Sequence, residues 1–258
     1  MNAQRVGMRV IGILAMSAMV SAGQPETLES GSWQAPNGLT FPYRWHAPEE
    51  PAPGKRYPLV LFLHGAGERG DDNQAQLKHG VGAILREAAK LNEPFFLLVP
   101  QCPKDTHWAP FDRAKDEYKT DEKSNERLAA VWSLVEKFRK DQPVDPARVY
   151  VTGISMGGFG TWALLARESK EIAAAVPICG GGDVRYARRF KDVPVWAFHG
   201  EADSIISVEY TRAIIGALEK AGGKPKSTYY PGVDHDSWTM TYDNPEVLRW
   251  LFAQKKPG

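Results

Sequence analysis

The sequence contains few of the residues that build disulfide or metal scaffolds. Two cysteines among 258 residues are too few for a disulfide-rich fold or a four-cysteine zinc site. The six histidines are scattered along the chain, and no HExxH or similarly close spacing occurs among them. A metal site therefore has no support in the sequence, and we expect none.

An excess of charge of one sign is also missing. The chain has 32 Lys+Arg against 31 Asp+Glu, which leaves a formal net charge of +1. This balance gives no electrostatic argument for binding nucleic acid or an anionic membrane, and we expect neither partner. Hydrophobic residues make up 43% of the chain, which is enough for a full core in one large α/β domain or two small ones.

The N-terminal segment is typical of a secretory signal peptide. Arg5 and Arg9 precede an apolar run at 10–20, and small residues occupy 21–23. The run is too short for a comfortable membrane span. We predict a signal peptide at 1–22 with cleavage after Ala22, and hence an exported protein, periplasmic or extracellular, without stable membrane anchoring. An uncleaved anchor or a buried helix is the alternative.

From residue 57 onward, short apolar runs alternate with helical patterns. Strands are expected at 57–63, 95–99, 148–152, 173–178, 195–198 and 226–230, after an opening hairpin built from the segment around Trp33 and from 39–45. Helices are expected at 124–140, 157–167, 208–221 and 245–252.

Strands that are apolar throughout are expected where helices cover both faces of a parallel sheet. We therefore predict the α/β class, with one catalytic domain over 23–258 and a mostly parallel, doubly wound sheet with helices on both faces. Ligands of such sheets bind beyond the carboxyl ends of the strands, so the chemistry should lie in the residues that follow each strand.

The most informative motif lies between the strand at 148–152 and the helix at 157–167. Residues 153–158 read GISMGG, which is a G-x-S-x-G pattern between a strand and a helix. This tight turn needs small residues beside the serine and lifts its hydroxyl above the sheet. We interpret Ser155 as a nucleophile; a glycine-rich helix start with an idle serine is the alternative.

A hydroxyl nucleophile needs a base, and the base needs an orienting acid. The strand at 195–198 is followed by HGEAD, and the strand at 226–230 is followed by PGVDHD. The chain order Ser155, Asp203, His235 is the one expected for this architecture, so we predict His235 as the base and Asp203 as the acid. The competing candidates are His199 for the base and Glu201, Asp234 and Asp236 for the acid.

Residues 64–70, HGAGERG, follow the strand at 57–63 and have two interpretations. Their glycines match the G-x-G-x-x-G of dinucleotide-binding loops, but a polar turn follows where a helix should begin. In the other interpretation, the loop places a backbone N–H over the serine. The N–H groups of Ala66 and Met156 would then hold a developing oxyanion together.

Together, HGAGERG, GISMGG, HGEAD and DHDSW resemble the motifs of the α/β-hydrolase superfamily in this order and spacing. The chain is similar to its exported esterase and dienelactone-hydrolase-like group, which includes predicted peptidases, phospholipase/carboxylesterases and feruloyl or acetylxylan esterases. The resemblance covers roughly residue 39 to the C-terminus. It implies Ser155, Asp203 and His235 as the triad and Ala66 and Met156 as oxyanion donors.

The expected activity is hydrolysis of a carboxylic ester through an acyl-enzyme, without a cofactor. The expected substrate is a small-molecule or polysaccharide-linked ester. A serine peptidase with the same triad is the alternative among enzymes, although we find neither a propeller domain nor a long insertion for a lipase-type lid. A catalytically silent binding protein on this fold is the alternative outside enzymes.

The resemblance also bears on the two cysteines. Cys102 and Cys179 follow strands that are not neighbours in this fold as the family draws it. Because a disulfide needs Cα atoms within about 7 Å, we expect two free thiols. A disulfide is the alternative, since export favours oxidation.

Two tryptophans are candidates for the substrate pocket. Trp108 lies in the long connection 101–123, and Trp238 follows the proposed base by three residues. Connections of that length are usually functional or disordered. We predict that one or both tryptophans line the pocket beside Ser155. The alternative is that they only pin loops to the core.

Overall fold

The computed structural model describes residues 28–256, apart from 50, 110, 113–116 and 119–121. The expected signal peptide at 1–22 therefore lies outside the described residues. Within the part of the chain that is described, no helix has both the length and the apolar character needed to cross a membrane.

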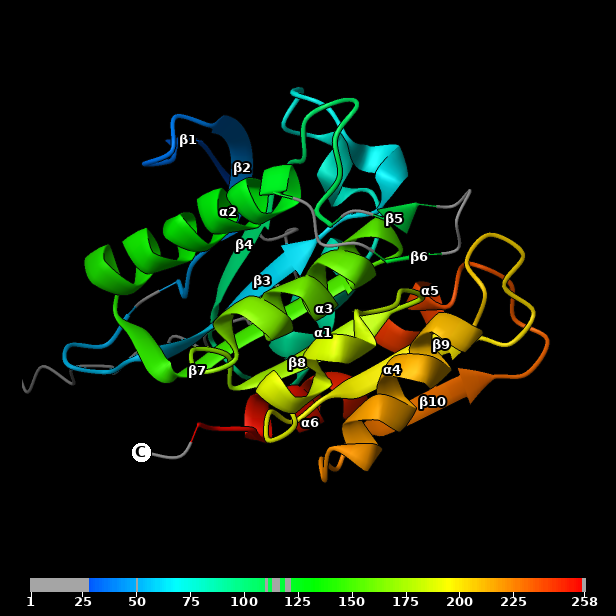
Figure 1. Ribbon diagram of the computed structural model, residues 1–258. Coiled ribbons are helices and arrows are strands. Elements are labelled where there is room, and N and C mark those ends of the chain that lie inside the picture. The colour runs from blue at the N-terminus through cyan, green and yellow to red at the C-terminus, as the bar shows by residue number, and fades with distance from the viewer. Residues whose placement is uncertain (1–27, 50, 110, 113–116, 119–121, 257–258) are drawn as a thin grey trace, which may run out of the picture.

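One mixed sheet of eight strands forms the centre of the fold (Figure 1). Its strands are β1 (Glu29–Gln34), β2 (Thr40–His46), β3 (Tyr57–Leu63), β4 (Phe96–Pro100), β7 (Val144–Ile154), β8 (Ala174–Ile178), β9 (Trp196–Gly200) and β10 (Lys226–Tyr230). Their spatial order is β1-β2-β4-β3-β7-β8-β9-β10. The pairs β1–β2 and β2–β4 are antiparallel and the remaining neighbours are parallel, which confirms the predicted mostly parallel sheet.

Helices cover both faces of this sheet (Figure 1). One face carries α2 (Glu122–Asp141), α3 (Met156–Glu168) and α4 (Glu209–Lys220), and the other carries α1 (Val81–Lys90), α5 (Trp238–Tyr242) and α6 (Pro245–Ala253). Successive residues of a strand point to opposite faces. In β3, Leu59 and Leu61 pack with α2 and α3, whereas Val60 and Phe62 pack with α1 and α6. Burial on both sides explains why this strand is apolar throughout.

Several elements differ from the prediction. Helix α1 was not expected, although Val81, Ile84, Leu85 and Ala88 form a buried i, i+3, i+4, i+7 stripe that indicates a helix. Short strands β5 (Phe111–Asp112) and β6 (Glu117–Tyr118) pair within the long connection 101–123, where no strand is predicted. Two-residue strands leave no periodic signal in a sequence, so they could not be predicted.

Both cysteines are buried free thiols, as expected. Cys102 follows β4 and Cys179 follows β8, and β3 and β7 lie between these strands in the sheet. The separation by two intervening strands, each about 4.8 Å wide, keeps the thiols beyond disulfide distance.

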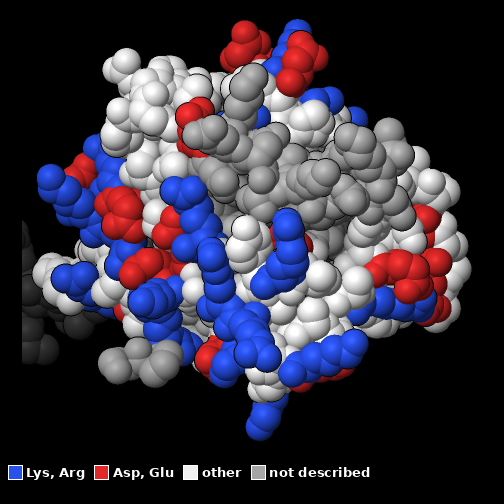
Figure 2. Space-filling view, viewed as in Figure 1, with Lys and Arg blue, Asp and Glu red and all other residues white. Residues whose placement is uncertain are grey.

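Acidic and basic side chains are interspersed over the face that carries α2, α3 and α4 (Figure 2). Basic side chains are more frequent toward the lower edge of this view, and acidic ones lie beside many of them. The pattern agrees with the nearly balanced composition of the chain.

Candidate active site

The ends of three parallel strands bring the predicted catalytic residues together. Ser155 directly follows β7, while Asp203 and His235 lie in the loops after β9 and β10. These strands are close in the sheet and run in the same direction, so their carboxyl ends share one edge. The sheet topology thus places the three side chains at one site.

Ser155 occupies a sharp turn between β7 and α3. Its backbone has φ 52° and ψ −116°, a conformation that non-glycine residues rarely adopt. A Cβ at Gly157 would lie 1.9 Å from the carbonyl oxygen of Leu63, and one at Gly153 would lie 2.5 Å from the carbonyl oxygen of Gly157. Only glycine fits at these two positions, so the G-x-S-x-G pattern is a steric requirement of the turn.

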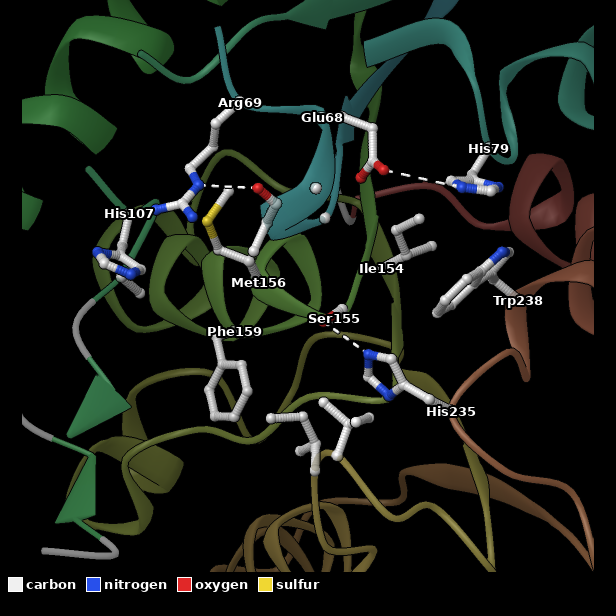
Figure 3. A pocket seen from close by; sticks show the side chains of 16 residues that line it. Glu68, Arg69, His79, His107, Ile154, Ser155, Met156, Phe159, His235 and Trp238 are labelled. Carbon is white, nitrogen blue, oxygen red and sulfur yellow. Dashed lines mark hydrogen bonds and ion pairs between the residues drawn. The ribbon is translucent and has the colours of Figure 1, made fainter. Parts of the chain in front are cut away.

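A continuous chain of hydrogen bonds joins the three side chains. The Ser155 hydroxyl lies 2.9 Å from His235 Nε2, and His235 Nδ1 lies 2.8 Å from Asp203 Oδ2. Figure 3 shows the first of these contacts in the pocket. The Asp203 carboxylate is fully buried, while the His235 side chain is 19% exposed. A base that is open to the pocket and held from behind by a buried carboxylate is oriented for proton transfer.

Asp203 is held as a carboxylate by four donors. Burial alone would raise its pKa, but hydrogen bonds from His199, His235 and the backbone N–H groups of Ile206 and Ile205 outweigh burial and hold the pKa well below its usual range. The two backbone bonds are 2.8 and 2.9 Å long and end on Oδ1. Oδ2 is thereby left for the two histidines.

The competing acids have other contacts. Asp234 accepts hydrogen bonds from the backbone and hydroxyl of Ser204 and ties the Asp203 loop to the His235 loop. Asp236 accepts from the backbone and hydroxyl of Thr239 at the start of α5. Glu201 pairs with Arg212 at the surface. Asp203 alone among these four carboxylates contacts the His235 ring.

The two predicted oxyanion donors flank Ser155. Ala66 begins the 3₁₀ turn η1 (Ala66–Glu68), and Met156 is the first residue of α3. A Cβ at Gly65 would lie 3.7 Å from Ser155 Cβ, so the loop passes directly over the serine. Neither N–H donates to another described group. Two free donors beside a serine hydroxyl match the geometry expected of an oxyanion site.

Sequence reasoning missed the residues that hold this loop. Arg69 Nε donates to the Ala66 carbonyl at 2.8 Å (Figure 3). Its Nη1 donates to the Thr106 carbonyl at 3.2 Å. His64 Nδ1 lies 2.6 Å from the Gly65 carbonyl oxygen, and its Nε2 accepts from the Cys102 N–H at 2.9 Å. The motif HGAGERG contained both residues, but its spacing said nothing of where their side chains point.

Trp238 lines a pocket of about 470 Å³ together with Ser155 and His235. Its ring packs edge-on against the His235 ring, with 5.3 Å between centroids. Trp108 is different, and the expectation that it lines the pocket needs correction. It is 1% exposed, its Nε1 donates to the His64 carbonyl at 3.0 Å, and its neighbour Ala109 lines the pocket instead.

The pocket wall combines an apolar and a polar side (Figure 3). The apolar side includes Ile154, Met156, Phe159, Ile205, Ile206 and Trp238, and the polar side includes Glu68, Arg69, His79 and His107. The Glu68 carboxylate is 8% exposed and lies 3.7 Å from His79 Nε2. Its Oε2 would lie 2.8 Å from a Cβ at Gly65, which places the carboxylate near Ser155. The sequence offered no signal for this buried acid.

One group of potential metal ligands occurs among the described residues. Cys179, Asp203 and His235 each offer one atom, and these atoms lie within 4.8 Å of one another. Asp203 and His235 are hydrogen-bonded to each other, and burial raises the pKa of the Cys179 thiol. We therefore assign Asp203 and His235 to the hydrogen-bond chain of Ser155.

Comparison with known proteins places this geometry in a family. The sequence profile of the Dienelactone hydrolase family matches residues 95–245, which is more than half of the chain. The chain belongs to the dienelactone hydrolase family. The matched residues 95–245 include Ser155, Asp203 and His235. The loop that contains Ala66 lies before them in the chain.

Proteins similar to this chain include esterases. The chain is similar to a solved structure of a thermostable esterase, with a TM-score of 0.82 and 39% sequence identity. The match covers 89% of this chain and 63% of the esterase chain. This likeness shows the α/β-hydrolase fold. A bifunctional acetylxylan esterase/xylanase of Neocallimastix patriciarum is 24% identical over 66% of this chain. A poly(3-hydroxyalkanoate) depolymerase C of Paucimonas lemoignei is 38% identical over 48% of it. The matches span only 22% and 28% of these two proteins.

Proposed function

We propose that this protein is an exported serine esterase that cleaves carboxylic esters through an acyl-enzyme. The observation that carries the proposal is the unbroken chain of hydrogen bonds from Ser155 through His235 to Asp203, at the wall of a pocket of about 470 Å³. Its family and its esterase relatives support the same activity.

Acylation begins when Ser155 Oγ attacks the ester carbonyl carbon and passes its proton to His235 Nε2. The carbonyl electrons move onto oxygen, and the N–H groups of Ala66 and Met156 hold the resulting oxyanion. Asp203 stabilises the imidazolium that forms. When the intermediate collapses, the bond to the alcohol oxygen breaks, and the alcohol leaves with the proton from His235.

Deacylation repeats these steps with water. Neutral His235 takes a proton from water, whose oxygen attacks the acyl carbon. The second intermediate uses the same two N–H donors. Its collapse breaks the bond to Ser155, returns the proton to the serine oxygen and releases the carboxylic acid. The cycle needs no cofactor, because His235 returns every proton that it accepts.

The pocket indicates an ester with a short acyl group and a hydroxylated alcohol. Its volume suits a small substrate rather than a long flexible chain. Glu68 offers hydrogen-bond acceptors and Arg69 offers donors on the same wall, and a sugar hydroxyl can use both. An acetylxylan esterase among the relatives supports a polysaccharide-linked ester.

The experiment that tests the nucleophile is fluorophosphonate labelling followed by peptide mapping. The adduct should form on Ser155, and Ser155→Ala should lose labelling and hydrolysis of p-nitrophenyl acetate. Ser227→Ala, at an exposed position of β10, is the matched control and should retain both. A wild-type protein that neither labels nor turns over any ester would show a silent fold.

Export rests on the sequence of residues 1–22 and needs a separate test. The full chain should appear in the periplasmic or extracellular fraction of a bacterial host, shortened by about 22 residues on intact-mass analysis. A version without residues 1–22 should stay inside the cell. Retention of the full-length chain in the membrane fraction would overturn the assignment.

A further inference from the structure

Asp203 contacts a second histidine besides the base. His199, the fourth residue of β9, is fully buried, and its Nε2 lies 3.1 Å from Asp203 Oδ2 and 3.0 Å from the Ile206 carbonyl oxygen. On the other side of the ring, its Nδ1 lies 2.7 Å from Thr211 Oγ1. Every polar atom of this ring therefore has a partner, and the partners determine where its protons must lie.

Thr211 requires a proton on His199 Nδ1. A threonine hydroxyl has one proton, and Thr211 donates it to the Gly180 carbonyl oxygen at 2.6 Å. The same oxygen can then only accept from His199 Nδ1, which must carry a hydrogen. If Thr211 donated to His199 instead, two oxygen atoms would face each other at 2.6 Å with no hydrogen between them.

The opposite side of the ring requires a second proton. Asp203 Oδ2 is an ionised carboxylate oxygen and the Ile206 oxygen is a carbonyl, so both are acceptors only. His199 Nε2 must therefore donate. A histidine that donates from both nitrogens is an imidazolium.

His64 shows the opposite pattern in the same protein. It is equally buried, but its Nδ1 donates to the Gly65 carbonyl while its Nε2 accepts from the Cys102 N–H. One donor and one acceptor define a neutral ring. Burial lowers the pKa of His64 to about 4, in agreement with that assignment.

We propose that His199 is a buried imidazolium through neutral pH, and that its charge keeps the triad base unprotonated in more acidic solution. The effect on rate rests on the proposed catalytic role of His235, whereas the charge of His199 does not. Both histidines bind Asp203 Oδ2, at 3.1 and 2.8 Å. A cation this close opposes a second positive charge on His235, so His199 acts as a positioning residue that sets the pH range.

The surroundings favour this charge. Asp203 faces His199 from the loop after β9, and Asp234 and His235 lie behind it in the loop after β10. Cys179, directly after β8, stays neutral because burial raises its thiol pKa. The remaining charged and titratable groups nearby are Tyr229 opposite His199 on β10, Glu209 and Arg212 on α4, Glu201 after β9 and Asp236. The ionised acid beside the ring compensates the buried cation.

The charge can be observed directly by ¹⁵N NMR of the histidine side chains at pH 7.5. His199→Gln and His64→Gln assign the two buried rings by loss of their signals. We expect both ring nitrogens of His199 to carry hydrogen, and one ring nitrogen of His64. A neutral tautomer of His199 at this pH would overturn the proposal, whether or not the protein hydrolyses esters.

The consequence for catalysis appears in the pH profile of kcat/KM for p-nitrophenyl acetate. His199→Gln keeps an N–H donor for Asp203 but removes the charge, so the acid-side midpoint should rise by about 1–2 pH units. Thr211→Val removes the acceptor of the Nδ1 proton and should move the midpoint in the same direction. Arg212→Gln removes an exposed cation, screened by solvent, from α4, the helix that carries Thr211. This control should leave the midpoint unchanged.

These outcomes separate the proposal from simpler roles. A purely structural His199 would lower the plateau rate and leave the midpoint unchanged, which would contradict the proposal. Wild-type labelling at a serine other than Ser155 would overturn the triad and leave the NMR result to decide the charge of His199. An unchanged midpoint in both His199→Gln and Thr211→Val would overturn the effect on pH range.

Discussion

Replacement of Trp108 by phenylalanine should reduce stability far more than it changes substrate choice. The indole is 1% exposed, and its Nε1 donates to the His64 carbonyl at 3.0 Å. The ring also packs edge-on against His64, with 5.2 Å between centroids, and touches Gly160. Phenylalanine fills only part of this space and has no donor for the carbonyl.

Two contributions set the magnitude. Removing part of the buried ring lowers the free energy of unfolding by about 1–2 kcal/mol, because apolar burial is lost and a cavity is left. The unpaired, buried His64 carbonyl costs about 1–2 kcal/mol more. The sum of about 2–4 kcal/mol corresponds to a fall in Tm of about 6–12 °C for a chain of this size.

Trp162 provides the matched control. It is also 1% exposed, but its Nε1 has no acceptor among the residues that the structure describes. Trp162→Phe therefore removes similar ring volume without breaking a hydrogen bond, and its Tm should fall by about half as much as that of Trp108→Phe. The difference between the two variants measures the hydrogen bond to His64.

The assay is thermal unfolding by circular dichroism, with the ratio of aromatic to aliphatic ester hydrolysis measured on the same samples. An unchanged Tm for Trp108→Phe with an altered substrate ratio would refute the packing argument and return Trp108 to the pocket wall. Equal losses for Trp108→Phe and Trp162→Phe would show that the hydrogen bond contributes nothing.

Three further changes test other parts of the site. Asp203→Asn should lower kcat by about 10⁴-fold, since an amide no longer fixes the working tautomer of His235; Asp234→Asn should cost much less, and steady-state kinetics that show the reverse order would reassign the acid. The pKa of His64 is about 4 in the folded protein against about 6.5 in the unfolded chain. Its contribution to stability is therefore fully present above pH 6.5, and the free energy of unfolding falls by about 3 kcal/mol as the pH falls toward 4. Urea titrations should show the wild type losing its advantage over His64→Gln across that window, and a constant difference would contradict a neutral His64. Glu68→Gln should raise KM severalfold for an acetylated xyloside but leave p-nitrophenyl acetate nearly unaffected, and equal effects on both substrates would argue against a hydroxyl-binding role.

The sequence predicts those features of the site that depend on where the strands end. Parallel strands share their carboxyl edge, so the sequence predicts that Ser155, directly after β7, lies near Asp203 and His235 in the loops after β9 and β10. The choice of Asp203 over Asp234 depended on side-chain direction, and the structure shows that only Asp203 reaches the ring.

The remaining features depend on side-chain contacts that have no local pattern. Trp108 and Trp238 are both aromatic residues near the site, but one points into the core and the other into the pocket. Glu68 lies in a polar, glycine-rich loop, yet its side chain is buried. The 3₁₀ turn Ala66–Glu68 directs the Glu68 side chain inward. Such directions follow from the packing of elements far apart in the sequence.

The strained backbone of Ser155 has a consequence for laboratory evolution. A residue held at φ 52° and ψ −116° costs about 1–3 kcal/mol, and glycine would relieve most of this cost. Selection for heat resistance alone would therefore enrich Ser155→Gly, and the most durable clones would lack the hydroxyl that we propose as the nucleophile. A library of this protein should be screened for ester cleavage in the same round as for survival, because at this position the two properties oppose each other.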